Sequence, residues 1–251
     1  GWEKGWEILL SMRGNMSVIT ERSFGVPQGI INGEFGIGVV IDFFGFSAVS
    51  SGLPVEFVYP SITPLVPASI GLIKGAPHKD NARKFINFFL SREGQRLLFD
   101  SKISRLPVIP TLYEDAPQGF PNPFKMKKTE TKFDVQLSQQ RYGLINSLFD
   151  QLITFRLRDL KRAWSEIHKA EKRIEKKESR NQDVAVLKNL IAEAKMLVTQ
   201  VPVLEAEAND LEYNQHFAKE ADKVQIRAET EWDVIAKKNY RLAKDLAKKV
   251  K

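Results

Sequence analysis

Residues 20–44 have the sequence TERSFGVPQGIINGEFGIGVVIDFF, and the expected fold depends on this stretch more than on any other. Ser23 precedes a short segment that is typical of a helix start, and the glycine-spaced apolar run after Gly33 is typical of a buried strand. A Ser at the mouth of such a helix leaves backbone N–H groups facing a cleft, where they and the positive helix end hold an anion. Arg22 and Asp42 flank this predicted cleft.

Strand and helix patterns alternate around this stretch. Apolar residues at helical spacing predict one helix at the N-terminus and a pair of helices over residues 80–99. Unbroken or alternating apolar runs predict short strands at residues 36–42, 54–60 and 69–75. Because short strands that alternate with helices are typical of α/β folds, residues 1–104 are predicted to form an α/β lobe.

A proline-rich segment, residues 105–127, follows the predicted lobe. Its prolines stand at positions 107, 110, 117, 121 and 123. Proline lacks the backbone N–H and clashes with the preceding turn of a helix, so this segment is predicted to be an extended connector that runs over a surface. We place a domain boundary there.

Residues 128–251 carry helical patterns, with apolar residues that recur at threes and fours in three runs. The runs cover residues 145–167, 187–197 and 211–246. Turns are expected at residues 179–181 and 201–203. Three helices that fold back on one another would bury all three stripes, which predicts an all-α helical hairpin or three-helix bundle.

Composition and charge exclude several classes of protein. With 251 residues, 43% of them hydrophobic, the chain is long enough for one or two packed domains. Its net charge of +7 is spread over both parts, and neither part is basic enough to require nucleic acid. The absence of cysteine excludes disulfides and cysteine nucleophiles. The basic run at residues 172–177 is interleaved with glutamates, which is typical of a solvated helix face.

Nothing in the sequence predicts catalysis, a metal site or a cofactor. His78, His168 and His216 lie in separate predicted elements, without a second ligand at metal-binding spacing. The glycines of GEFGIG, residues 33–38, lack the spacing and the following helix of a nucleotide-binding fingerprint. No Ser-His-Asp arrangement has support beyond composition. We therefore expect a binding protein and not an enzyme.

Four segments together resemble one protein family. They are Arg-Ser at residues 22–23, NGEFGIGVVID at residues 32–42, PASIGLIKGAPHKDNARKFINFFLSREGQ at residues 67–95 and RLPV at residues 105–108. The chain is similar here to the C-terminal half of bacterial extracellular solute-binding proteins, in the branch that includes ferric-ion and organophosphate binders. The resemblance implies two α/β lobes that close on a solute in the periplasm, with the first lobe and a signal peptide upstream of Gly1.

The resemblance also indicates the kind of solute. Iron binders of this branch have two adjacent tyrosines where this chain has Phe43 and Phe44, and a phenyl ring offers no oxygen to a ferric ion. An anionic organic solute is therefore expected, and the resemblance implies a phosphorylated three-carbon compound. Thr20, Arg22 and Ser23 are expected to supply hydrogen bonds and charge to it.

Each candidate residue also has a simpler interpretation. Ser23 could serve only as a helix cap. Arg22 could be a solvated surface charge, or could pair with Glu21 or Glu34. Asp42, which we expect to accept a hydrogen bond from a solute hydroxyl at the end of a strand, could instead form a turn.

For the whole protein, the resemblance implies solute capture coupled to regulation of that solute's transport. Hinge closure would bring the lobes together around the solute, and the helical tail would report the closed state to a membrane-bound sensor kinase. Two other functions stay open: delivery of a solute or ferric ion to an ABC permease, and a structural role for the helical hairpin. The apolar stripes of the tail are also compatible with a homodimer.

Overall fold

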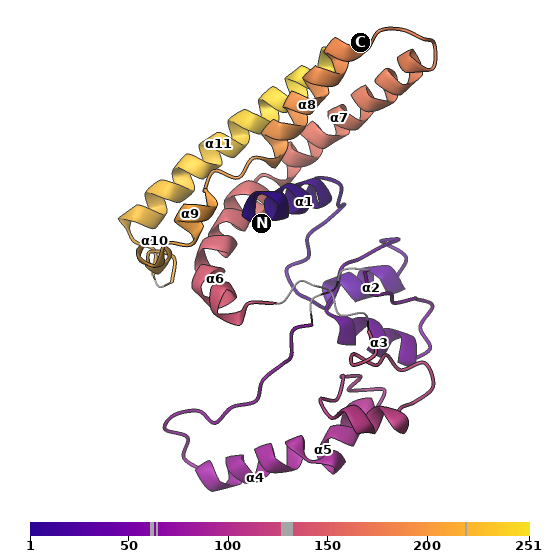
Figure 1. Ribbon diagram of the computed structural model, residues 1–251, viewed down its shortest axis with the longest axis vertical. Helices are drawn as coiled ribbons and strands as arrows, with labels where there is room; N and C mark the ends of the chain where they lie inside the picture. Colours follow the sequence, from indigo (N-terminus) through magenta and orange to yellow (C-terminus); the bar gives the residue numbers. More distant parts are fainter. Residues whose placement is uncertain (61–62, 64, 127–132, 219) are drawn as a thin grey trace. The chain divides into compact units, whose positions relative to one another are not determined.

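The computed structural model describes residues 1–60, 63, 65–126, 133–218 and 220–251. Within these residues every regular element is a helix and none is a strand (Figure 1). The predicted α/β fold is therefore wrong. Residues 127–132, where the predicted connector meets the predicted helical domain, lie outside the described residues.

The three segments predicted as strands are irregular, and many of their apolar side chains face solvent, although Phe57 and Tyr59 are half-buried. Ile37 is 92% exposed and Ile73 is 77% exposed. A strand gains its stability from the backbone hydrogen bonds and side-chain pairs that it makes with a neighbouring strand, and no described segment supplies such a neighbour. An apolar run shows that a segment prefers burial, but it does not show that a partner exists. At the end of the first run, Asp42 begins a helix instead.

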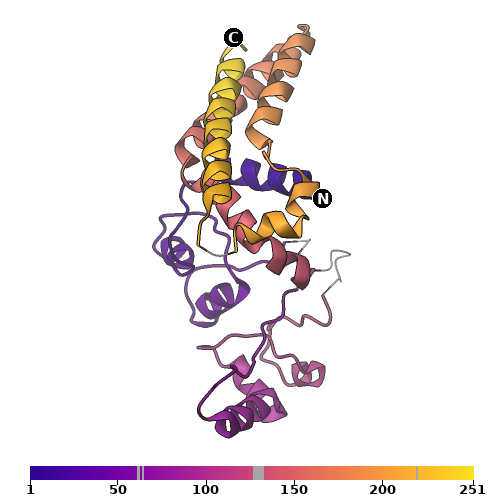
Figure 2. The same ribbon diagram turned by 90° about the vertical axis from the view of Figure 1, so that its left-hand side faces the viewer.

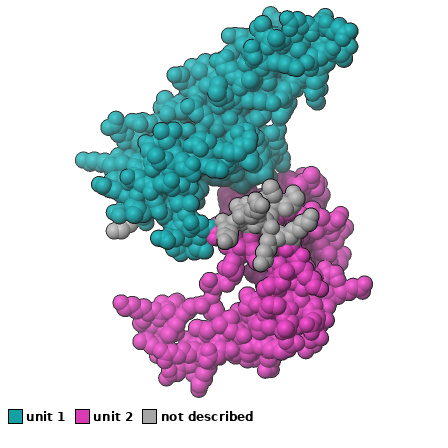
Figure 3. All heavy atoms as spheres, viewed as in Figure 1, with its two compact units in different colours: residues 1–19, 134–251 teal, residues 20–133 magenta. Residues whose placement is uncertain are grey.

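The chain divides into two compact units, which Figure 3 shows in teal and magenta. Unit 1 comprises Gly1–Ile19 and Asp134–Lys251, and unit 2 comprises Thr20–Phe133. The N-terminal helix thus packs with the C-terminal helices, although a long stretch of sequence separates them. The division into a lobe, a connector and a helical domain, which the sequence predicts, stays a prediction.

Unit 1 is built from helices. They are α1 (Trp2–Gly14), α6 (Val135–Phe149), the π-helix η3 (Asp150–Thr154), α7 (Leu157–Glu178), α8 (Ala185–Thr199), α9 (Glu205–Ala208), α10 (Leu211–Gln215) and α11 (Lys223–Lys248). The three long helices α7, α8 and α11 lie side by side in both ribbon views (Figures 1 and 2). The turns expected at residues 179–181 and 201–203 do separate helices.

The core of unit 1 lies between these helices. Leu160 and Ile167 of α7 and Val198 of α8 are fully buried. Alanines fill much of α11's inner face, and Ala243 and Ala247 are also fully buried. Small side chains let helix backbones approach closely, while the larger ones from the facing helix fill the space between them. This packing explains how helices with many charged residues still form a buried apolar core.

Two of the predicted helical runs are interrupted. The first breaks at the π-helix η3, and α7 starts again beside Arg156, whose guanidinium donates two hydrogen bonds to the carboxylate of Asp233 on α11. The hydrogen bonds that Arg156 donates to Asp233 raise the pKa of Arg156. The third run breaks at Asp222, which caps α11 by accepting hydrogen bonds from the backbone N–H groups of Val224 and Gln225 at 2.8 and 3.0 Å. Side-chain contacts, not propensity, set both breaks.

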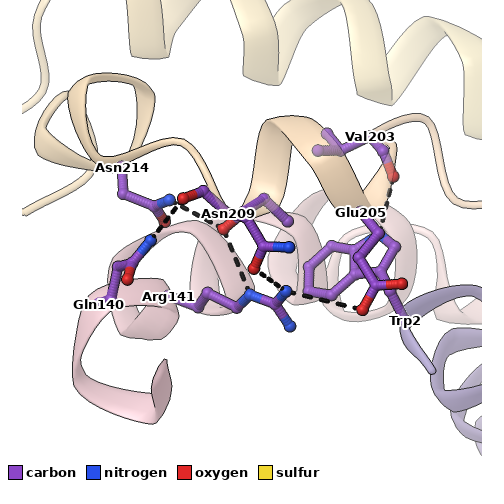
Figure 4. Close-up of polar contacts among 8 residues, drawn as sticks. Trp2, Gln140, Arg141, Val203, Glu205, Asn209 and Asn214 are labelled. Atoms are coloured by element: carbon purple, nitrogen blue, oxygen red, sulfur yellow. Dashed lines mark hydrogen bonds and ion pairs between the residues drawn. The ribbon is translucent and has the colours of Figure 1, made fainter. Parts of the chain in front are cut away.

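A buried polar cluster joins α1 and α6 to the segment around α9 (Figure 4). Arg141 is 8% exposed; its Nε donates to the carbonyl of Ala208 at 3.2 Å, and its guanidinium also binds the side chain of Asn209. The same guanidinium lies 5.0 Å from the ring centroid of Trp2, whose indole N–H donates to the Val203 carbonyl at 2.7 Å. Buried polar groups are stable only when they are paired in this way.

Unit 2 has shorter helices and little core. They are α2 (Gly25–Ile31), α3 (Asp42–Ser50), α4 (Lys79–Leu90), α5 (Arg92–Arg96) and the 3-10 helices η1 (Leu97–Phe99) and η2 (Pro110–Glu114). Gln95 is 1% exposed and bridges two segments: its amide N–H donates to the Phe89 carbonyl, and its amide oxygen accepts from the Val108 N–H. Aromatic rings supply most of the remaining contacts.

These rings form one continuous chain of contacts, which we call the aromatic cluster; all are edge-on except that between Phe46 and Phe120, whose planes meet at 39°. Its members are Phe46, Phe57, Tyr59, Phe99, Tyr113, Phe120 and Phe124. Phe46 lies at its centre, with ring centroids 4.8 Å from Phe57 and 5.7 Å from Tyr59. Edge-to-face pairs of this kind stabilise by about 0.5–1.5 kcal/mol each beyond the burial of their area. The cluster brings α3 together with residues from the proline-rich segment.

Candidate functional site

Asp42 lies at the first position of α3, in unit 2. Ile41 before it is extended, with φ −69° and ψ 139°, and the chain turns into the helix at Asp42. One carboxylate oxygen accepts a hydrogen bond from the Phe43 N–H at 2.8 Å, and the other accepts from the Tyr59 hydroxyl at 2.9 Å. A carboxylate at this position is favoured by the positive end of the helix. The side chain is therefore held in one orientation.

Tyr59 is the partner that fixes Asp42. Its ring packs edge-on against Phe46 and Phe57 in the aromatic cluster. Burial, the hydrogen bond to Asp42 and the charge of that carboxylate all raise the pKa of Tyr59. The phenol is therefore protonated at neutral pH and acts as the hydrogen-bond donor to Asp42.

A cation–π contact lies next to Asp42. The guanidinium carbon of Arg105 is 3.2 Å from the centroid of the Phe43 ring, and the Phe43 and Phe44 centroids are 4.4 Å apart. Arg105 is exposed, so its positive charge lies at the surface over the Phe43 ring. Across the described part of the chain, no group of three or more His, Cys, Asp or Glu side chains is arranged to hold a metal ion.

Thr20, Arg22 and Ser23 precede α2. The Thr20 hydroxyl donates to the Arg22 carbonyl at 3.0 Å, which folds this turn on itself. The N-cap of α2 is Phe24, without a side-chain hydrogen bond, so the interpretation of Ser23 as the cap is wrong. Arg22 and Ser23 are exposed. Because α2 has only seven residues, positive charge at this turn comes from Arg22 and not from a helix end.

The structure does not bring the four predicted residues into one cluster. Thr20 and Arg22 are in contact, but no hydrogen bond or ion pair among the described residues joins Asp42 to that turn. None of the four lines either of two surface cavities that lie along α7 in unit 1. Sequence reasoning missed Tyr59 and Arg105 as neighbours of Asp42. Both residues lie in segments that the sequence analysis singled out, Tyr59 in the alternating segment at residues 54–60 and Arg105 in RLPV. A sequence pattern of this kind does not predict which distant residue a side chain will contact.

Comparison with known families gives the class of protein. The profile of the bacterial extracellular solute-binding protein family matches residues 1–129, which contain all four predicted site residues as well as Tyr59 and Arg105. The chain belongs to this family. In the described part of the chain, no helix has both the length and the apolar character needed to cross a membrane.

Individual relatives narrow the comparison. The chain is 32% identical over 243 residues to the phosphoglycerate transport regulatory protein of Salmonella typhimurium. The alignment covers 97% of this chain and 56% of that protein, and the protein of the same name from Salmonella typhi matches equally. An uncharacterized protein of Haemophilus influenzae is 29% identical over 147 residues, covering 58% of this chain and 42% of that protein. The chain thus spans about half the length of these relatives. No solved structure matches.

The two kinds of match have different extents. The family profile ends at residue 129, before α6, whereas the similarity to the transport regulatory protein extends over 97% of the chain and therefore includes the long C-terminal helices. These helices are thus shared with a regulatory protein and lie outside the part that defines solute-binding proteins in general.

Proposed function

We propose that this chain is part of a periplasmic protein that binds a small anionic solute, a phosphorylated three-carbon compound, and regulates the transport of that solute. The observation that carries the proposal is the 32% identity to a phosphoglycerate transport regulatory protein along nearly the whole chain. The family match over residues 1–129 supports solute binding, without catalysis, as the underlying activity. The protein would change its conformational equilibrium through the solute's higher affinity for one state.

Arg22 and Asp42 are the proposed anchors for the solute. Arg22 is exposed beside the Thr20 hydroxyl and Ser23, and its planar guanidinium suits bidentate contact with a phosphate or carboxylate group. Asp42 is already oriented by Tyr59, and the free lone pairs of its carboxylate accept a solute hydroxyl. The two anchors would recognise opposite ends of a hydroxylated, phosphorylated acid.

Unit 1 is the proposed contact with the rest of the signalling system. Its C-terminal helices lie outside the solute-binding family profile but are shared with the transport regulatory protein. A membrane-bound sensor kinase is therefore the proposed partner. Delivery of the solute to an ABC permease is the second candidate, which the family match favours. Homodimerisation through unit 1 and a purely structural role for its helices stay predictions.

Thermal unfolding of the full-length protein tests the proposal. A ligand that binds only the native state at a hundred times its Kd stabilises by about 2.7 kcal/mol, which raises the Tm of a protein about twice as long as this chain by about 3–5 °C. The ligands are 3-phosphoglycerate, 2-phosphoglycerate, phosphoenolpyruvate, inorganic phosphate and ferric ion. The three-carbon phosphates should raise Tm in the parent protein and in Arg96→Ala, an exposed control in unit 2, but not in Arg22→Ala.

The same series distinguishes the alternatives. A shift with ferric ion alone would assign the protein to metal delivery and discard the phosphate proposal. A shift that survives Arg22→Ala and Asp42→Asn would move the solute site away from these residues. No shift with any of the five ligands would leave the proposed solute without support.

A further inference from the structure

One face of α7 carries cationic and hydroxyl side chains at spacings of three and four residues. They line two adjoining cavities of about 610 and 380 Å³, which share Lys161 and Ser165. We call this surface the α7 groove. Its cationic members are Arg158, Lys161, Arg162, Lys169 and Lys172, of which Lys169 pairs with Glu166 at 2.7 Å. No carboxylate lines either cavity, although α7 as a whole contains several.

Most of this positive charge is not neutralised. Arg158, Arg162 and Lys172 are exposed, and none of them forms an ion pair with a described residue. Lys161 is half-buried and donates only to the backbone carbonyl of Ser17, at 3.0 Å. Like charges three or four residues apart on a helix destabilise it by about 0.2–0.5 kcal/mol per pair. A bound anion would relieve this repulsion.

His168 also lines the α7 groove. Its Nδ1 lies 2.8 Å from a carboxylate oxygen of Glu171, and its Nε2 lies 2.8 Å from the side-chain oxygen of Asn15. The amide nitrogen of Asn15 already donates to the Ser11 carbonyl, so the oxygen must face the imidazole. Both ring nitrogens therefore have partners within the chain, which hold the imidazole in one orientation.

Two buried donors without acceptors lie around the same end of α1. The Nε of Arg13 and the indole N–H of Trp164 have no hydrogen-bond partner. Gly14, which lines the smaller cavity, follows Arg13 and lies directly against the Trp164 ring. Buried donors of this kind are rare in folded proteins. Neither Arg13 nor Trp164 lines either cavity, so the proposal below rests on the side chains that do line them.

We propose that the α7 groove is a second anion site, which binds a phosphate group. A phosphate offers several acceptor oxygens and about two negative charges to the Arg and Lys donors. Phe155, which is 64% exposed, lies at the groove and provides an apolar surface for the organic part of the ligand. The phosphate is that of a free phosphate compound or of a lipid headgroup. The site lies in unit 1, so it does not depend on the solute site proposed in unit 2.

Calorimetric titration at constant ionic strength tests this site. The probes are inorganic phosphate, 3-phosphoglycerate and polyglutamate, and the protein carries Arg22→Ala throughout, so that the solute site of unit 2 does not contribute. The groove variant is Arg158→Gln with Arg162→Gln. The control is Arg180→Gln with Arg241→Gln, which removes the same charge from exposed positions outside both cavities. Cosedimentation with phosphatidylglycerol and phosphatidylcholine vesicles tests the lipid source.

The expected result is phosphate or 3-phosphoglycerate binding that weakens at least about tenfold in the groove variant and is unchanged in the control. The protein could also cosediment with phosphatidylglycerol vesicles. If only the groove variant loses this binding, the result would support the site and identify a lipid headgroup as the source of the phosphate. Equal losses in both variants, binding of polyglutamate alone, or no binding of any probe would overturn the proposal.

Discussion

In each unit, a tyrosine hydroxyl donates a hydrogen bond that fixes one local contact. In unit 1, Tyr240 of α11 is 2% exposed, and its hydroxyl donates to the Leu152 carbonyl in the π-helix at 2.8 Å. In unit 2, Tyr59 performs the equivalent task for Asp42. Both phenols have a raised pKa, which burial causes first of all. Each hydroxyl therefore works only as a neutral donor.

This predicts how stability depends on pH. An unfolded tyrosine loses its proton near pH 10, whereas folding raises the pKa of Tyr240, so the unfolded state binds fewer protons above that pH. The stability that Tyr240 contributes is therefore complete below about pH 10 and is lost as the pH rises further. Denaturant titrations of Tyr240→Phe should show a loss of about 1 kcal/mol at pH 7 and a shallower alkaline decline than the parent protein.

Tyr142→Phe is the matched control, since Tyr142 is 68% exposed. It should leave both the neutral-pH stability and the alkaline decline unchanged. If Tyr240→Phe and the parent protein declined in parallel above pH 10, the hydroxyl of Tyr240 would not be the group that titrates.

At this scale the sequence identifies candidates but not their partners. Asp42 stood out because it is a polar residue at the end of an apolar run, and it is indeed a fixed carboxylate. Its partner Tyr59 lies seventeen positions further along the chain. Arg105, which stacks on Phe43, is further still. Such contacts depend on how helices and loops come together, and no local pattern encodes them.

Among the elements, α1 makes the most closely fitted contact. Its last residue, Gly14, is buried, and a Cβ atom there would lie 1.9 Å from the Trp164 ring of α7. The glycine is therefore required by packing and not by an unusual backbone angle. Gly5, in the same helix, has no atom near the position of an added Cβ.

The two glycines give opposite predictions. Gly14→Ala should destabilise by about 1–3 kcal/mol, because α1 must shift away from Trp164. Gly5→Ala should stabilise by up to about 1 kcal/mol, because alanine favours helix at an open position. Thermal denaturation of both variants measures the difference. Equal effects would show that α1 does not sit against Trp164.

Whether an element could be predicted from the sequence depends on whether local or long-range interactions specify it. Helices α7, α8 and α11 were predictable, because hydrogen bonds within the helix and an apolar stripe suffice to specify them. The interruptions were not, because they depend on contacts such as that of Arg156 with Asp233. The strands were predicted wrongly, because an apolar run cannot reveal whether a neighbouring strand is present.

For the whole molecule, the two units differ in how much they bury. Nearly all fully buried side chains lie in unit 1, whereas the described part of unit 2 buries few and exposes many large apolar ones. Local opening is easiest where few apolar contacts are lost. The units should therefore differ in dynamics on the timescale of hydrogen exchange.

Amide hydrogen exchange measures that difference. Protection should be greatest in α7, α8 and α11 and least in residues 36–41 and 54–60, which form few backbone hydrogen bonds. The residues in the middle of α7 provide the internal reference. Comparable protection in residues 36–41 and in α7 would mean that the apolar runs are paired in solution.

The assembly of unit 1 from two distant parts of the sequence affects the order in which it folds. The hydrogen bond from Trp2 to Val203 joins residues 201 positions apart. Trp2 and Trp6 are buried by helices that lie far along the chain, so both indoles stay exposed until those helices have folded. Closing so long a loop costs little extra free energy, but it slows folding. Completion of unit 1 therefore waits for the C-terminal helices.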